Sequence, residues 1–144
     1  MSGLIFVDTN VLLYAVDQAD PRKHTAARTW RKKLWETRRG RVSFQVLQEF
    51  YANVARKWPD SAASARVEVL DLLVWQPIKI DAGILKAGWK VQDRYGINFW
   101  DALIVAAAKA SSCEFLLSED FQAGLDFGGL RIVNPFRTEP EEVL

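Results

Sequence analysis

The chain has 144 residues, of which 49% are hydrophobic and 26% are charged, and its formal net charge is +1. This length and composition suit one globular domain over residues 1–144 that buries its own core, and we expect no second domain. The single cysteine, Cys113, excludes an intrachain disulfide and a cysteine-rich zinc site, so we expect a cytoplasmic location. The sequence has no secretory signal pattern, and no apolar run approaches the roughly 20 residues that span a membrane.

The chain opens with a strand pattern that ends on an acid. Residues 3–8 are apolar up to Asp8, and helical periodicity then covers residues 10–16. In an open α/β sheet, ligands bind in the crevice beyond the carboxyl ends of the strands, which makes Asp8 a candidate site residue. An acid there is costly to bury unless a cation or hydrogen bonds compensate it. The alternative is a helix N-cap, a role that Thr9 or Asn10 can also fill.

A basic helix is predicted next, from the break at Asp20-Pro21 to about Arg39, with Gly40 as its C-terminal stop. Nine lysines and arginines but only one acid lie between residues 22 and 41. Two interpretations stay open for this segment. It is either a surface that contacts RNA or a partner, or a solvated face of a helix whose apolar stripe packs inward.

A short strand over residues 42–44 is predicted to lead into a helix over residues 45–57, which carries Glu49. Glu49 lies beside the apolar face of this helix, so a site residue and an exposed acid are both possible there. The pattern then predicts a helix over residues 61–75 and an edge strand over residues 77–80. Asp81 is placed to cap a helix that runs to about residue 94.

The last helix is rich in alanine, runs from Asn98 to about Ser111 and carries Asp101. Asn98 and Asp101 have the spacing of a capping box, so Asp101 taken alone favours a structural role. A strand over residues 114–117 then leads to a polar turn with Ser118 and Asp120. Spacing alone does not separate Asp120 from Glu119 or Asp126. The final strand covers residues 130–133, and the acidic segment 136–144 is expected to be a flexible tail.

Strands separated by helices predict a doubly wound, three-layer α/β/α domain with a central, mostly parallel sheet flanked by helices. Right-handed crossovers bring the carboxyl ends of the parallel strands to one edge, where Asp8 and the loop with Asp120 must meet. Carboxylates gathered there repel each other by roughly 4 kcal/mol per pair at 4 Å and an effective dielectric constant of 20. That repulsion points to a divalent cation, and oxygen ligands suit Mg²⁺ or Mn²⁺.

Four segments of the chain resemble the PIN domain, and their order and spacing resemble its VapC toxin branch. The segments are residues 6–14, 45–51, 99–104 and 117–122. The likeness extends from residue 4 to residue 136. It implies a PIN-like α/β/α fold and a Mg²⁺- or Mn²⁺-dependent endoribonuclease that acts as the toxin of a toxin–antitoxin pair.

The resemblance also implies roles for individual residues and partners. It carries the metal-binding and catalytic roles to four acids, namely Asp8, Glu49, Asp101 and Asp120. It gives supporting roles beside the metal to Ser118, Asn10 and Thr9. The implied partners are a cognate VapB-like antitoxin, a second copy in a homodimer, and an RNA substrate, whether transfer, ribosomal or messenger RNA.

Two alternative functions stay open, and two others fit the residues less well. A PIN nuclease of RNA maturation and a non-catalytic RNA- or protein-binding PIN module share the same motifs. A receiver domain needs a second acid adjacent to Asp8, and a haloacid-dehalogenase-type phosphatase needs one where Asn10 stands. His24 is the only histidine, which excludes a histidine-pair ribonuclease, and no nucleotide phosphate loop is present. We expect most of the six tryptophans to pack in the core.

Overall fold

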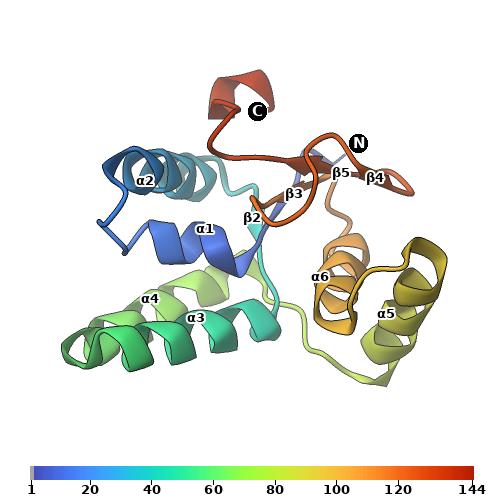
Figure 1. The fold of residues 1–144 in the computed structure, drawn as a ribbon, viewed down its shortest axis with the longest axis horizontal. Helices are drawn as coiled ribbons and strands as arrows, with labels where there is room; N and C mark the ends of the chain where they lie inside the picture. The colour runs from blue at the N-terminus through green and yellow to red at the C-terminus, as the bar shows by residue number, and fades with distance from the viewer. Residues whose placement is uncertain (1) are drawn as a thin grey trace.

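The computed structural model describes residues 2–144, which form a mostly parallel five-stranded sheet flanked by helices (Figure 1). The strands are β1 (Ile5–Val7), β2 (Gly40–Arg41), β3 (Phe115–Leu117), β4 (Asp126–Phe127) and β5 (Leu130–Val133). Their order across the sheet is β2-β1-β3-β5-β4, and only the β4–β5 pair is antiparallel. The predicted mostly parallel α/β sheet is confirmed.

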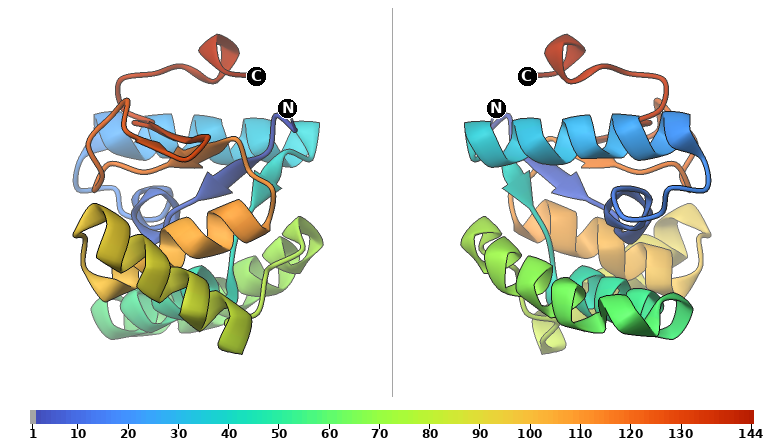
Figure 2. Two further views of the ribbon diagram at one scale, coloured as in Figure 1. Left: turned by 90° about the vertical axis from the view of Figure 1, so that its right-hand side faces the viewer. Right: turned by 90° about the vertical axis from the view of Figure 1, so that its left-hand side faces the viewer.

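Helices cover the sheet on two sides (Figure 2). They are α1 (Thr9–Tyr14), α2 (Pro21–Thr37), α3 (Phe44–Lys57), α4 (Ala62–Leu72), α5 (Ala82–Tyr95) and α6 (Phe99–Ala110). Helix α2 lies along one side of the sheet, and α6, covered by α5, lies on the other (Figures 1 and 2). Helices α3 and α4 pack side by side, and α1 lies between α2 and α3.

The sequence explains these layers through the spacing of small and apolar residues. On α2, the buried positions Ala27, Trp30 and Leu34 recur every three or four residues, which gives the helix one apolar face. On α6, every residue from 102 to 108 is buried, because this helix lies between the sheet and α5. Gly88 of α5 allows a close approach, since a Cβ there would lie 2.9 Å from Cδ2 of Leu103.

The end of α2 differs from the prediction. The helix stops at Thr37, and Arg38 takes the left-handed conformation, with φ of 59°, that Gly40 was expected to supply. Gly40 instead lies in β2, two residues before the predicted second strand over residues 42–44. That strand cannot continue because Ser43 caps α3, its side chain accepting a hydrogen bond from the backbone N–H of Val46.

Gly40 is required for packing, and its replacement provides a test of this assignment. A Cβ at residue 40 would lie 2.7 Å from the buried ring of Trp75, so Gly40→Ala should destabilise the domain by roughly 1–3 kcal/mol. Gly83→Ala, in the first turn of α5 and free of any such clash, is the matched control. Urea unfolding followed by circular dichroism measures the stability of both variants. Equal unfolding midpoints for Gly40→Ala and Gly83→Ala would refute the close packing of Gly40 on Trp75.

Two short segments near the sheet also depart from the prediction. The expected strand over residues 77–80 reduces to a single bridge between Ser43 and Ile78, because the facing segment turns into helix α3 at Phe44. The antiparallel strand β4 was not expected. Its signal is the Gly128-Gly129 pair between Phe127 and Leu130, where both glycines have positive φ and form a tight hairpin turn.

The remaining helical segments are short. Three 3-10 helices flank the longer ones, namely η1 (Pro59–Ser61), η2 (Leu73–Trp75) and η3 (Pro140–Glu142). The predicted helix over residues 61–75 is therefore α4 followed by η2. In the acidic segment 136–144, where the sequence predicts a flexible tail, Pro140 is buried and the Trp30 indole donates to the carbonyl of Thr138. No helix in the described part of the chain is both long and apolar enough to cross a membrane.

Candidate active site

The site is built where the carboxyl ends of β1 and β3 lie side by side. The backbone N–H of Asp8 donates to the carbonyl of Leu117 at 3.0 Å, which joins the two strand ends. Directly beyond this bond, the Ser118 hydroxyl donates to Oδ2 of Asp8 at 2.7 Å. The other carboxylate oxygen of Asp8 accepts from the backbone N–H of Thr9 at 2.8 Å, so Asp8 is also the N-cap of α1. Asp8 can therefore cap α1 and still be a residue of the candidate site.

Asn10 joins α1 to the turn after β3. Its amide nitrogen lies 3.1 Å from Oδ2 of Asp8, 3.2 Å from Oγ of Ser118 and 3.1 Å from Oδ2 of Asp120. Its carbonyl oxygen accepts from the backbone N–H of Glu119 at 3.3 Å. The Asn10 amide therefore bonds both Asp8 and Asp120, which are distant in sequence.

The other two predicted acids reach the site from separate helices. Glu49 lies on α3, and its Oε1 accepts from the hydroxyl of Thr9 at 3.0 Å. Asp101 lies in the first turn of α6, where Asn98 caps the helix through the backbone N–H of Asp101 at 2.9 Å. The Asn98 amide also donates to Oδ2 of Asp101 at 2.8 Å. The expected cap at Asn98 is present, and the Asp101 carboxylate is not needed for it.

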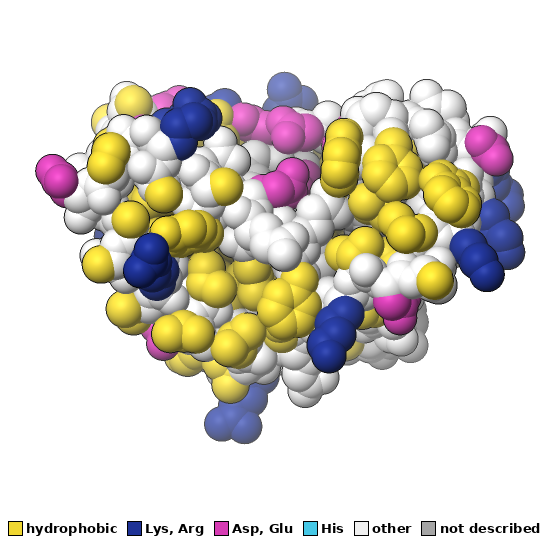
Figure 3. Space-filling model, turned by 90° about the horizontal axis from the view of Figure 1, so that it is seen from below, with side chains coloured by type: hydrophobic (Ala, Val, Ile, Leu, Met, Phe, Trp, Pro, Cys, Tyr) yellow, Lys and Arg dark blue, Asp and Glu magenta, His cyan; other side chains and the backbone are white. Residues whose placement is uncertain are grey.

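The charges of the four acids influence one another. Burial, with smaller contributions from the charges of Asp120 and Glu49, raises the pKa of Asp8 to about 6. Burial also raises the pKa of Glu49, with a contribution from Asp101, and that of Asp101, with a contribution from Asp120. These couplings form a closed ring of like charges. Figure 3 shows acidic side chains gathered in a hollow between two lobes rich in hydrophobic side chains.

The structure separates Asp120 from the two acids that spacing alone allowed. Glu119 accepts a hydrogen bond from the hydroxyl of Tyr14 at 2.8 Å and pairs with the ammonium of Lys23 at 2.7 Å. Asp126 accepts from the backbone N–H of Gly129 at 2.6 Å, inside the β4–β5 turn. Of these three carboxylates, that of Asp120 is the one that accepts a hydrogen bond from Asn10 and raises the pKa of Asp8.

Comparison with known proteins identifies the family. The sequence profile of the PIN domain matches residues 5–123, most of the chain. The chain belongs to the PIN domain family. No curated protein matches it in sequence.

Three solved structures share the fold of this PIN domain. A toxin–antitoxin complex from Klebsiella pneumoniae is 18% identical, with a TM-score of 0.64 over 91% of this chain and 97% of that chain. VapC20 from Mycobacterium tuberculosis, a toxin that cleaves the sarcin-ricin loop, is 24% identical, with a TM-score of 0.61 over 78% of this chain and 86% of that chain. VapBC2 from Rickettsia felis, bound to promoter DNA, is 17% identical, with a TM-score of 0.63 over 91% of this chain and 98% of that chain. The predicted resemblance to VapC is confirmed at the level of the fold.

The donors in this PIN domain suit a hard divalent cation in chemistry. They are carboxylate, hydroxyl and amide oxygens, which Mg²⁺ and Mn²⁺ prefer, and burial and mutual repulsion raise the pKa values of Asp8, Glu49 and Asp101. Among residues 2–144, no three Asp, Glu, His or Cys side chains lie close enough to form a ready ligand cage. The residues fit a Mg²⁺ site in which water fills part of the coordination shell, as this ion favours.

Ser118 orients Asp8, and its removal is expected to have a measurable cost. Ser118 is fully buried, donates to Asp8 and accepts from the backbone N–H of Asp120 at 3.1 Å. Ser118→Ala leaves that N–H without its partner, so we expect a loss of about 1–3 kcal/mol in unfolding free energy. Because this hydroxyl lowers the pKa of Asp8, the variant should raise that pKa. Urea unfolding measures the first effect and carboxyl NMR titration the second.

Ser118→Thr is the matched control, because it keeps the hydroxyl. We expect it to retain the wild-type pKa of Asp8 and most of the stability. A Ser118→Ala protein with unchanged stability and an unchanged Asp8 titration would contradict the orienting role.

Several residues of the basic segment in this PIN domain make contacts within the chain. Lys23 pairs with Glu119, and its ammonium lies 5.1 Å from the centre of the Tyr14 ring. Arg31 pairs with Glu68 at 2.6 Å and lies over the rings of two tryptophans, Trp35 and Trp75. These residues join α2 to neighbouring segments, and this contribution to the fold was not expected from the charge pattern.

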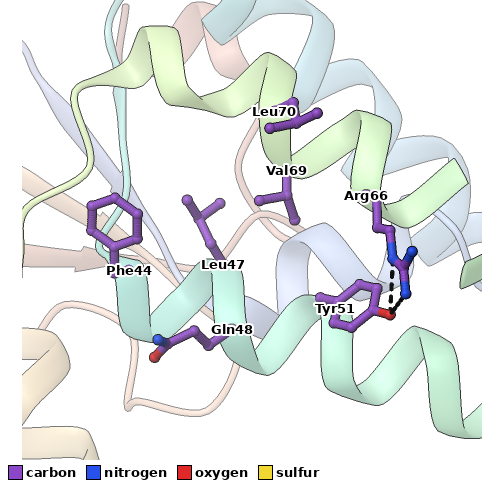
Figure 4. Close-up of a pocket in the computed structure, with 7 residues that line it drawn as sticks. All are labelled: Phe44, Leu47, Gln48, Tyr51, Arg66, Val69 and Leu70. Atoms are coloured by element: carbon purple, nitrogen blue, oxygen red, sulfur yellow. Dashed lines mark hydrogen bonds between the residues drawn. The ribbon is translucent and has the colours of Figure 1, made fainter. Parts of the chain in front are cut away.

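An apolar groove of about 480 Å³ lies between α3 and α4, outside the acidic site (Figure 4). Its lining residues are Phe44, Leu47, Gln48, Tyr51, Arg66, Val69 and Leu70. Arg66 is held at one end by hydrogen bonds of 3.1 and 2.9 Å to the hydroxyl of Tyr51. Exposed apolar side chains continue along α4, including Val67 and Leu70. Contiguous patches of this kind are typical of protein interaction surfaces.

Proposed function

We propose that this PIN domain is a metal-dependent endoribonuclease and the toxin of a type II, VapBC-like toxin–antitoxin pair. The observation that carries the proposal is the convergence of four carboxylates on the edge of a PIN fold, with like charges coupled around a closed ring. The fold shared with VapC20, a toxin that cleaves the sarcin-ricin loop, supports RNA as the substrate.

In this proposal the chain's own residues hold and orient the reacting groups. Four acids, Asp8, Glu49, Asp101 and Asp120, would hold Mg²⁺ or Mn²⁺ and position the attacking water in line with the scissile bond. The chemistry that the bound ion supplies is neutralisation of charge on the phosphodiester and activation of that water. Ser118 and Asn10 fix the carboxylate of Asp8, and Thr9 fixes that of Glu49, through the hydrogen bonds described above.

We also propose two protein partners, a cognate VapB-like antitoxin and a second copy of the chain. The fold shared with the Klebsiella pneumoniae toxin–antitoxin complex and with the Rickettsia felis VapBC2 complex supports the antitoxin. The exposed apolar residues on α4 support at least one protein contact, because a monomer would leave them in water.

The experiment that tests the activity is 5′-end mapping of total bacterial RNA incubated with antitoxin-free protein in Mg²⁺. We expect discrete new ends that disappear when EDTA removes the metal. If the folded protein produces no new ends, the chain is a non-catalytic binding module. Growth arrest on expression, relieved by the antitoxin, separates a toxin from a nuclease of RNA maturation, whose expression would be harmless.

A further inference from the structure

Exposed tryptophans in this protein are more frequent than the sequence suggests. We expected most of the six to pack in the core, but only Trp30 and Trp75 are fully buried. Trp35, Trp89 and Trp100 are exposed. The Arg31 guanidinium covers Trp35 at 4.9 Å from its ring centre. Trp100 is the most exposed of the six, at 64%, and it directly precedes Asp101 of the candidate active site.

Contacts within the chain hold Trp100 in place. Its carbonyl accepts from the amide of Gln45 on α3 at 3.4 Å, and Asn98 caps the same turn of α6. The ring of Trp100 meets that of Phe99 edge to face, with centres 5.2 Å apart. Gln45 is itself buried, and its Oε1 has no hydrogen-bond partner in the described chain. Gln45 therefore joins α3, one turn before Glu49, to the backbone of Trp100, although burying its unpaired oxygen costs stability.

The acidic site explains what such an indole would bind. Apart from a bound metal ion, the four carboxylates offer no attraction to the phosphates of a nucleic acid, so contacts to the bases would add to the affinity for RNA. A nucleobase has a planar, uncharged face that stacks on aromatic side chains, and the stacking tolerates any base. In Figure 3, hydrophobic side chains gather beside the acidic hollow, on the lobe formed by α5 and α6. A flanking base of a phosphodiester held beside Asp101 would lie next to the first turn of α6, which carries Trp100.

We propose that Trp100 is a base-stacking residue, and that the base of an unpaired nucleotide beside the scissile phosphodiester lies on its indole. The nucleotide must be unpaired because a base inside a duplex has its faces covered by its neighbours. A loop or a single-stranded segment therefore fits the site, and a continuous duplex does not. This inference rests on the proposed ribonuclease function and adds a residue that binds the substrate beside the acids.

The test uses an RNA stem-loop that contains a cleavage site found by end mapping, and the same stem-loop with an abasic residue beside the scissile bond. Cleavage rates are measured for the wild type, Trp100→Ala, Trp100→Phe and Trp89→Ala. We expect Trp100→Ala to lower kcat/KM about tenfold and Trp100→Phe to retain most of the activity. Trp89→Ala, which removes an indole that is 52% exposed on α5, should leave the rate unchanged.

The abasic substrate identifies the contact itself. The wild type should lose about the same factor on the abasic RNA as Trp100→Ala loses on the intact RNA. Trp100→Ala should cleave the two RNAs at equal rates, because the base then has no stacking partner. A fully paired version of the same RNA should resist cleavage by every variant.

Each other outcome overturns the inference in a distinct way. Equal rates for the wild type and Trp100→Ala would show that the indole does not bind substrate, with the ribonuclease function intact. Independent, multiplicative losses from Trp100→Ala and the abasic residue would show that the two do not touch. A Trp100→Ala protein whose oligomeric mass in sedimentation differs from that of the wild type would assign the indole to a protein contact. A wild type that cleaves no RNA at all would refute the proposed function, and this inference with it.

Discussion

Asp101→Asn is expected to lower RNA cleavage by about a hundredfold or more while leaving the fold intact. The carboxylate lies in the ring of four acids that we propose to hold the metal, and an amide supplies a weaker, uncharged ligand. The helix cap does not depend on this carboxylate, because Asn98 bonds the backbone N–H of Asp101. Loss of one favourable charge in the first turn of α6 is offset by relief of the repulsion from Asp120.

Cleavage by Asp101→Asn is measured on the RNA that end mapping identifies, and melting is followed by circular dichroism. Asp93→Asn is the matched control, because it makes the same chemical change at an exposed position on the neighbouring helix α5. We expect it to cleave at the wild-type rate. Full activity in Asp101→Asn would return Asp101 to a structural role in the first turn of α6, whereas an unfolded variant would contradict the capping geometry.

The metal-free protein is expected to become more stable as the pH falls from about 7.5 to about 5. Asp8 is only 7% exposed, and its burial raises the pKa from the ordinary value of 3.8 to about 6 in the folded state. The folded state therefore binds more protons than the unfolded state between these two values. The penalty for burying the charge is absent below pH 3.8 and complete above about pH 6, where it amounts to roughly 3 kcal/mol.

About half of this penalty, roughly 1–2 kcal/mol, should be recovered between pH 7.5 and pH 5. The raised pKa values of Glu49 and Asp101 act in the same direction. Urea unfolding in EDTA at the two pH values measures the effect, and Asp8→Asn should reduce it. At the higher pH, Mg²⁺ should restore the stability, whereas NaCl of equal ionic strength should not. A metal-free protein whose stability is independent of pH in this range would contradict the buried charge at Asp8.

Local patterns were sufficient for much of the fold. Apolar runs and helical periodicity located the parallel strands β1, β3 and β5 and the six longer helices, because burial of one face requires that spacing. These local patterns failed where a residue distant in sequence determines the packing or the conformation of the backbone. Gly40 looked like a helix stop, but the ring of Trp75 requires a glycine there for packing. The Gly128-Gly129 pair was a readable signal for the β4–β5 hairpin, and the prediction did not use it.

The sequence by itself determined that an acid ends the first strand. It also placed three further acids on two helices and in the turn after another strand. Only the tertiary structure decided which of them meet. Asn10 and Asp120 are 110 positions apart in the chain, and no local period relates them. Glu119 and Asp120 are adjacent carboxylates, yet the side chains of Lys23 and Tyr14 bind the first carboxylate and the side chain of Asn10 binds the second. The exposure of Trp100 is equally a tertiary property, because an indole is buried or free according to what packs against its helix.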